Sequence, residues 1–325
     1  MEYTKLGNTG MDVSRICLGC MGFGDAENWV HKWVLNEENS RPIIKHALEL
    51  GINFFDTANV YSIGVSEEIL GRALKDFANR DEVVIATKVH GRMREGSNGA
   101  GLSRKAILSE IDHSLRRLGT DHIDLYQIHS WDGSVQIEET LRTLDDLVRA
   151  GKVRYLGASN FDAWQLCRAN DVAEMRGWEA FVSVQPEYNM LAREIEKELL
   201  PYCEWSGVGL LPYFPLAGGF LTGKYTRGEA PPAGTRGQRS QYVQQFLKPE
   251  NFDVLDRLRP LAEAQGRPLA DLAIAWLLAQ PRVSSVIAGA TKPEQIRINA
   301  AASTWKLTAE EMAAIQTVLE GKALG

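Results

Sequence analysis

The sequence has few cysteines, and their spacing excludes a disulfide framework. Only four occur among 325 residues, at positions 17, 20, 167 and 203, whereas disulfide-stabilised domains are small and dense in cysteine. Cys17 and Cys20 have the two-residue spacing of a metal or redox pair, but no second cysteine pair or histidine pair completes a zinc set. Because Cys17 lies in the apolar run Ile16-Cys17-Leu18, we expect both thiols to be buried as small apolar groups, and we predict no metal site.

Long apolar runs and basic blocks are also missing. The longest apolar-leaning stretch, residues 208–221, is too short for a membrane span and is interrupted by Pro212 and Pro215. The N-terminus lacks the apolar core of a secretory signal. The formal net charge is −6, and no run of five Lys or Arg residues occurs, which argues against nucleic-acid or membrane partners. We expect a cytoplasmic protein with a small-molecule substrate, and no feature predicts an oligomeric state.

A glycine fingerprint for dinucleotides is absent too. Gly19, Gly22 and Gly24 have the wrong spacing for Gly-x-Gly-x-x-Gly after a strand. A Rossmann-type phosphate turn is therefore not predicted.

What the sequence does contain is a regular alternation of short apolar runs with longer helical patterns. We predict strands at residues 16–19, 52–55, 83–87, 123–128, 153–157, 181–185, 208–212 and 285–287. Apolar residues recur at three- and four-residue spacing in intervening stretches such as 41–50, 66–77, 103–118 and 135–150. Eight such units predict an α/β protein with the (β/α)8 fold of a TIM barrel, rather than a doubly wound sheet.

Additional segments surround this predicted barrel, which we take as a single domain over residues 1–325. Residues 1–15, with the turn at 7–10, predict an N-terminal β-hairpin that closes the N-terminal end of the barrel. Residues 21–39 and 214–250 predict long loops at the barrel mouth, by which we mean the C-terminal ends of the strands. Extra C-terminal helices are predicted at residues 252–265, 269–279 and 308–319.

Three predicted strands end on groups that carry chemistry. The second ends at Asp56, the third at Lys88 and the fourth at His129, and Tyr61 follows Asp56 on the adjoining loop. The C-terminal ends of barrel strands converge, so these side chains are expected to meet. A phenol titrates near pH ~10, and a neighbouring ammonium favours its ionised form, so we expect Lys88 to lower the pKa of Tyr61. Alternatively, these groups form a structural ion pair, a loop aromatic and a strand-end imidazole.

These residues resemble those of a known family, the aldo-keto reductase superfamily. The branch that the sequence resembles most includes bacterial aldo-keto reductases and potassium-channel β-subunits. The motifs that carry the resemblance are Asp56-Thr57-Ala58-x-x-Tyr61, Ala86-Thr87-Lys88, the strand end at His129, Gly157-Ala158-Ser159-Asn160 and Gly289-Ala290-Thr291. It implies NADPH-dependent reduction of aldehydes or ketones to alcohols. In that reaction Tyr61 would be the general acid, tuned by Lys88 and Asp56, and His129 would orient the substrate.

The resemblance also implies where the NADP(H) cofactor lies. Ser159, Asn160 and Gln185 resemble the groups that hold the nicotinamide carboxamide, and Tyr213 resembles the aromatic residue that stacks on the ring. Ser159 or Asn160 could instead cap the helix that follows.

A glycine-rich segment after Tyr213 resembles the family loop that folds over the pyrophosphate. It includes Pro215, Leu216 and Gly218, and Lys224 and Arg236 supply positive charge for phosphate oxygens. A solvated basic loop is the alternative interpretation.

The eighth strand is followed directly by a predicted helix start. Gly289, Thr291 and Lys292 lie there, where exposed backbone amides and a cation favour an anion. This favours NADPH over NADH, because the extra phosphate has a place to bind. Gln295 and Asn299 match family positions that contact the adenosine end.

Two positions depart from the family pattern. Ile298 replaces an acid that many relatives carry beside Asn299, which puts the adenine contact in doubt, and Ser62 replaces the common glycine after Tyr61.

Two other functions compete with carbonyl reduction. A Schiff-base aldolase would use Lys88 as a nucleophile, but that reaction needs a neutral amine, which Asp56 would oppose. The second is an NADPH-binding regulatory module with weak or no turnover. For the substrate, Trp29, Trp33 and Trp131 suggest an apolar pocket, or simply pack.

Overall fold

The structure, a computed structural model, describes residues 1–323 and contains a barrel of parallel strands. The strands are β3 (Ile16–Gly19), β4 (Phe54–Asp56), β5 (Val84–Val89), β6 (Ile123–Ile128), β7 (Val153–Ser159), β8 (Phe181–Gln185), β9 (Gly209–Leu210) and β10 (Val286–Gly289). Their order in the sheet is β10-β3-β4-β5-β6-β7-β8-β9. The outer strands meet as well, because the Leu210 amide donates to the Arg282 carbonyl at 2.8 Å and the Ile287 amide to the Pro212 carbonyl at 2.9 Å. The predicted (β/α)8 barrel is confirmed.

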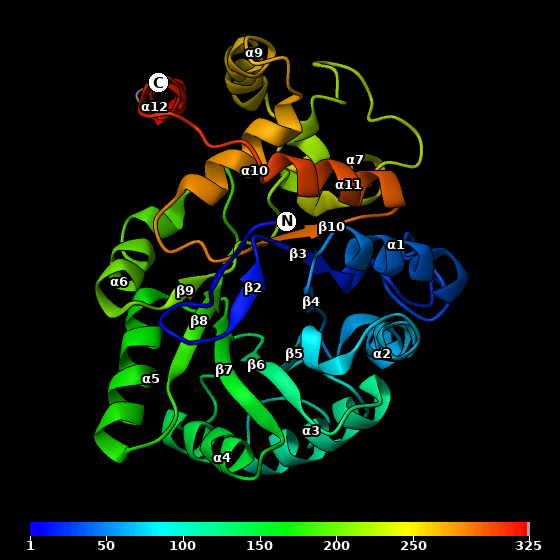
Figure 1. Ribbon diagram of the computed structural model, residues 1–325, viewed down its shortest axis with the longest axis vertical. Helices are drawn as coiled ribbons and strands as arrows, with labels where there is room; N and C mark the ends of the chain where they lie inside the picture. Colours follow the sequence, from blue (N-terminus) through cyan, green and yellow to red (C-terminus); the bar gives the residue numbers. More distant parts are fainter. Residues whose placement is uncertain (324–325) are drawn as a thin grey trace.

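Helices follow the strands and lie outside them (Figure 1). They are α1 (Glu37–Glu49), α2 (Val65–Phe77), α3 (Arg104–Leu118), α4 (Ile137–Arg149), α5 (Ala163–Arg176), α6 (Leu199–Ser206), α10 (Leu269–Ala279) and α11 (Pro293–Ala302). Sequence signals fix their ends: the Asn36 side chain caps α1, and Gly119 ends α3 at φ 64°, a conformation that costs glycine little. Buried apolar side chains of these helices join the core cluster that also contains strand residues.

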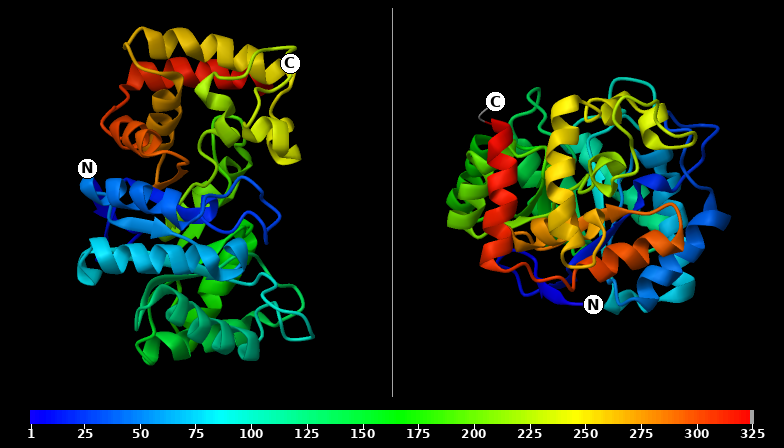
Figure 2. Two further views of the ribbon diagram at one scale, coloured as in Figure 1. Left: turned by 90° about the vertical axis from the view of Figure 1, so that its right-hand side faces the viewer. Right: turned by 90° about the horizontal axis from the view of Figure 1, so that it is seen from above.

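Two further helices belong to the predicted C-terminal addition. They are α9 (Pro249–Glu263) and α12 (Ala309–Ala323), which lie side by side above the barrel (Figure 2). Among the described residues, no helix is both long enough and apolar enough to cross a membrane.

The N-terminal hairpin is present and covers the end of the barrel opposite the mouth. β1 (Tyr3–Lys5) pairs antiparallel with β2 (Asp12–Ser14). Leu6 and Val13 are fully buried and join the cluster inside the barrel. Gly7 has φ 55°, and a Cβ there would lie 2.5 Å from the Val182 carbonyl oxygen, so only glycine allows this close approach.

The core has two parts. One lies between the sheet and the helices, and the smaller one fills the barrel with side chains that include Cys17, Phe54, Leu125 and Ile287. Cys17 and Cys20 are both fully buried and free, which confirms the expectation that they pack as apolar groups. Burial also raises the pKa of both thiols well above the usual range.

Some boundaries differ from the prediction at the mouth. β4 includes Asp56, β5 continues one residue beyond Lys88, and β7 extends to Ser159. Polar side chains end the apolar pattern, but their backbone still pairs with neighbouring strands: Lys88 faces Gln127 in the ladder, and Ser159 faces Gln185. The chemistry-bearing residues are therefore held by the sheet itself.

Candidate active site

Asp56, Lys88 and Tyr61 meet at the barrel mouth. The Lys88 ammonium donates to Asp56 Oδ1 at 2.5 Å, to the Thr57 carbonyl at 2.9 Å and to the Tyr61 hydroxyl at 3.3 Å. Lys88 is fully buried and Asp56 nearly so, whereas Tyr61 is half-buried. The strand ends thus form a buried ion pair that contacts one phenol.

Two glutamines complete the shell around Asp56. The side-chain amides of Gln127 and Gln185 each donate to Asp56 Oδ2 at 2.9 Å, and Gln185 also donates to Gln127 at 3.1 Å. Sequence reasoning did not include Gln127, although a buried amide inside the apolar run of β6 was an available signal. Gln185 was predicted to contact a cofactor, but in the structure its amide nitrogen is bound to Asp56.

The electrostatics of this cluster favour a charged lysine and a protonated phenol. Burial alone would lower the pKa of Lys88, but the Asp56 carboxylate and Tyr61 outweigh it, and the pKa rises above its usual value. Burial raises the pKa of Tyr61, and the opposing effect of Lys88 does not reverse this. Lys88 thus lowers the pKa of Tyr61, as expected, but the net shift is upward because desolvation of the phenolate dominates.

His129 lies beside Tyr61 as a neutral imidazole. The two ring centroids are 5.7 Å apart in an edge-on arrangement. Burial, together with the positive charge of Lys88, lowers the pKa of His129 to about 3. At neutral pH the ring can therefore donate or accept a hydrogen bond but carries no charge.

The residues predicted for the nicotinamide end form one network beside His129. The Asn160 side-chain amide donates to the His129 carbonyl at 2.9 Å, and the Tyr213 hydroxyl donates to Asn160 Oδ1 at 2.9 Å. Ser159 is buried and donates to the Gln185 carbonyl at 2.9 Å. Neither Ser159 nor Asn160 caps α5, because that helix begins with a capping box formed by its own N-cap residue, Asp162.

The backbone of the predicted pyrophosphate loop is of the kind that a ligand can approach closely. Pro215 and Gly218 are buried and Leu216 is half-buried. Gly218 has φ 66°, the left-handed region that favours glycine. Lys224 is exposed, with its ammonium 5.2 Å from the centre of the Tyr225 ring.

Arg236 differs from the other cations of that loop. Its guanidinium is half-buried and lies 4.1 Å from the centre of the Trp33 ring, and burial lowers its pKa. Within the part of the chain that the structure describes, no carboxylate pairs with it. A half-buried cation without a counter-charge fits an anionic ligand.

The predicted adenosine end lies at the start of α11. Gly289 is exposed, and a Cβ there would lie 4.0 Å from Arg236 Nη2. Lys292 is the exposed N-cap residue and makes no side-chain cap bond. Gln295 Oε1 accepts from the Thr291 amide at 2.7 Å and from its hydroxyl at 3.1 Å, so this carbonyl oxygen serves the local turn.

The two remaining predicted positions lie deeper in α11. Asn299 is buried and Ile298 is half-buried. The structure thus brings most predicted positions to the same end of the barrel, with Asn299 covered.

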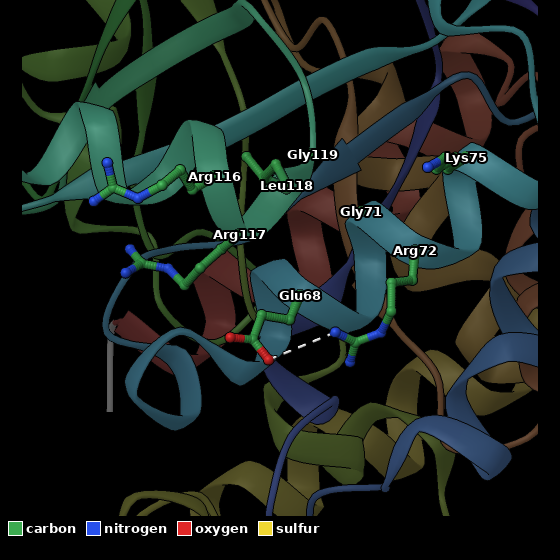
Figure 3. A pocket seen from close by; sticks show the side chains of 8 residues that line it. All are labelled: Glu68, Gly71, Arg72, Lys75, Arg116, Arg117, Leu118 and Gly119. Carbon is green, nitrogen blue, oxygen red and sulfur yellow. Dashed lines mark ion pairs between the residues drawn. The ribbon is translucent and has the colours of Figure 1, made fainter.

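A hollow with a volume of about 420 Å³ lies elsewhere, between α2 and α3 (Figure 3). Four cations line it, but Arg72 and Arg117 are paired with Glu37 and Glu67. The remaining two, at positions 75 and 116, lie at opposite ends of the hollow in Figure 3. Positive charge does not converge there, so we place the candidate site at the mouth. Among residues 1–323 no group of three or more potential metal ligands is found.

Comparison with known proteins places this geometry in a family. The family model described as Aldo/keto reductase family matches residues 15–320. Versiconal hemiacetal acetate reductase of Aspergillus parasiticus is 40% identical over 342 residues, covering 100% of this chain and 98% of the relative. Aldo-keto reductase dtxS3 of Metarhizium robertsii is 38% identical, with 89% and 83% covered. Aldo-keto reductase YhdN of Bacillus subtilis is 35% identical, with 98% and 94% covered.

Proposed function

The chain belongs to the aldo/keto reductase family of oxidoreductases, and we propose that it reduces aldehydes or ketones to alcohols with NADPH. The observation that carries the proposal is the contact of one buried ammonium, Lys88, with both the Asp56 carboxylate and the Tyr61 hydroxyl. A phenol held by a cation at the mouth of a barrel is a proton donor aimed at a substrate oxygen. The family generally uses a reduced nicotinamide cofactor, and we propose that this cofactor is NADPH rather than NADH.

Each residue of the cluster has a defined task in this reaction. NADPH, when bound, would supply the hydride for the new C–H bond. Tyr61 gives its hydroxyl proton to the carbonyl oxygen, so that the alcohol O–H forms and a phenolate remains. Lys88 stabilises that phenolate, and Asp56 keeps Lys88 charged. The neutral His129 donates a hydrogen bond that orients the carbonyl oxygen.

The raised pKa of Tyr61 suits a proton donor in the reducing direction. A phenol whose pKa lies above its ordinary value of 10.0 is fully protonated at neutral pH. A developing alkoxide is a stronger base than a phenolate, so proton transfer from Tyr61 remains favourable. By contrast, the raised pKa of Lys88 opposes the neutral amine that a Schiff-base aldolase requires.

Residues along the mouth fit the cofactor. Asn160 and Tyr213 would hold the nicotinamide end, and the unpaired guanidinium of Arg236 would bind a phosphate. Lys292, at the exposed start of α11, adds the charge that favours NADPH over NADH. Trp29, whose ring centroid is 6.2 Å from that of Tyr61, gives the substrate side an apolar wall, so small aromatic aldehydes are the first substrates to test.

The test is a fluorescence titration with NADPH and with NADH, followed by measurement of cofactor oxidation across a panel of aldehydes. We expect saturable binding, tighter for NADPH, and turnover of at least one aldehyde. Saturable NADPH binding without turnover on any carbonyl would contradict the proposal and favour a regulatory module.

A further inference from the structure

Two loops that are far apart in the sequence lie together at the barrel mouth. We define the first loop as residues 23–36, between β3 and α1, and the second loop as residues 211–248, between β9 and α9. Both project from the same side of the molecule, at the right of the left-hand view in Figure 2. The contacts between these loops link the proposed cofactor site to the proposed substrate site.

A continuous row of ring contacts runs from Tyr61 to Arg236 through the first loop. The Tyr61 and Trp29 centroids are 6.2 Å apart, and those of Trp29 and His31 are 4.6 Å apart. The His31 ring stacks on the Trp33 ring, with the centroids 5.3 Å apart and an angle of 28° between the ring planes. Trp33 in turn meets the Arg236 guanidinium, which belongs to the second loop, at 4.1 Å. The phenol and the unpaired cation are therefore linked by side chains in contact.

The base of the first loop is tied to the residue after Tyr61. The Ser62 hydroxyl accepts a hydrogen bond from the Asp25 amide at 2.8 Å, and a Cβ on Gly24 would lie only 2.4 Å from that of Ser62. Ser62 has φ 51°, a left-handed conformation in which serine is uncommon. The departure from glycine thus adds a hydroxyl that fixes the loop beside Tyr61.

The other end of the row is fixed as well. Arg236 begins α7 (Arg236–Arg239), and the next residue, Gly237, donates its amide to the Tyr225 hydroxyl at 3.0 Å and accepts from Gln244 at 3.1 Å. The Arg236 side chain makes no hydrogen bond within the described residues. Stacking on Trp33 occupies only the face of the guanidinium and leaves its in-plane N–H groups free for an anion.

We propose that Trp33 is a positioning residue that couples anion binding at Arg236 to substrate binding beside Tyr61. The inference rests on the proposed function and adds a regulation of the same site. Trp33 pre-orients the guanidinium for a cofactor phosphate, and the bound anion in turn holds the first loop, with Trp29, against Tyr61. Coupling between two binding equilibria is reciprocal, so loss of Trp33 must weaken both.

The test compares Trp33→Leu with Trp33→Phe, which keeps an aromatic face, and with Trp205→Leu as a control. Trp205 is 79% exposed in α6 and belongs to neither loop. The readouts are the Kd for NADPH by calorimetry and the KM for benzaldehyde at saturating NADPH. A cation–π contact of this kind predicts about 2- to 30-fold weaker NADPH binding in Trp33→Leu. The KM should rise in parallel, with kcat within about twofold.

The outcomes separate the two proposals. Recovery of most of both constants in Trp33→Phe, with no effect of Trp205→Leu, supports the coupling. A general packing defect in Trp33→Leu would be recognised separately, because it would also lower the thermal unfolding midpoint of that variant. If Trp33→Leu changes only one constant, or neither, the coupling is wrong while the reductase assignment stands. If the wild-type protein neither binds NADPH nor reduces an aldehyde, the proposed function itself fails.

Discussion

Replacement of Tyr61 by phenylalanine removes one oxygen atom from the site and should remove most of the activity. The ring remains, so its contacts with Trp29 and His129 are retained. Lys88 keeps its bonds to Asp56 and to the Thr57 carbonyl. The bond that is lost is long, at 3.3 Å, and its loss should change the free energy of unfolding by less than about 1 kcal/mol. Loss of a general acid costs about 10²- to 10⁴-fold in rate.

The assay is steady-state NADPH oxidation with a reactive aldehyde, together with the Kd for NADPH and a urea unfolding curve. We expect kcat to fall by about 10²-fold or more and the other two quantities to change little. Tyr3→Phe is the matched control, because Tyr3 lies in the N-terminal hairpin, where its hydroxyl donates to the Gly51 carbonyl. A Tyr61→Phe protein that retains more than about a tenth of wild-type kcat would refute the assignment of Tyr61 as the acid.

Three further predictions concern the buried ion pair, the pH dependence and the contact between α2 and α3. Lys88→Met leaves the Asp56 carboxylate buried without its cation, so the free energy of unfolding measured in urea should fall by about 3–5 kcal/mol; an unchanged unfolding midpoint would contradict the ion pair. Since the pKa of His129 is about 3 and that of Tyr61 is raised, kcat/KM for reduction should be flat from about pH 5 to 9, and an inflection near pH ~6.5 would show that the imidazole titrates. Gly71 lies in α2, and Gly71→Ala places a Cβ 2.3 Å from the Leu118 carbonyl oxygen at the end of α3. The substitution should therefore lower the free energy of unfolding by about 1–3 kcal/mol without changing kcat. An unchanged free energy of unfolding would mean that α2 and α3 separate easily.

The barrel could be predicted because local patterns specify it. Strand β3 begins at Ile16 and ends at Gly19, as predicted from its apolar run, and Gly119 ends α3 as its position after the helical pattern suggested. The convergence of Asp56, Lys88 and His129 followed from topology alone, since parallel barrel strands bring their C-terminal ends together.

What could not be predicted depends on contacts between distant residues. Gln127 and Gln185 reach Asp56 across 71 and 129 positions of sequence, and neither has a local pattern that indicates this partner. The contact between Trp33 and Arg236 joins two loops whose conformations have no repeat to read. The pKa of Tyr61 depends on the balance between desolvation and one cation, and burial of a loop side chain is set only by the folded structure.

The measurement that tests the central claim most directly is transfer of a deuterium label. The purified protein is incubated with an aldehyde and NADPH that carries deuterium at the hydride position, and the alcohol is analysed by mass spectrometry and NMR. The account predicts one deuterium on the former carbonyl carbon for each NADPH oxidised, and loss of this product in Tyr61→Phe. NADPH consumption without label in the alcohol, or labelled alcohol formed equally well by Tyr61→Phe, would contradict it.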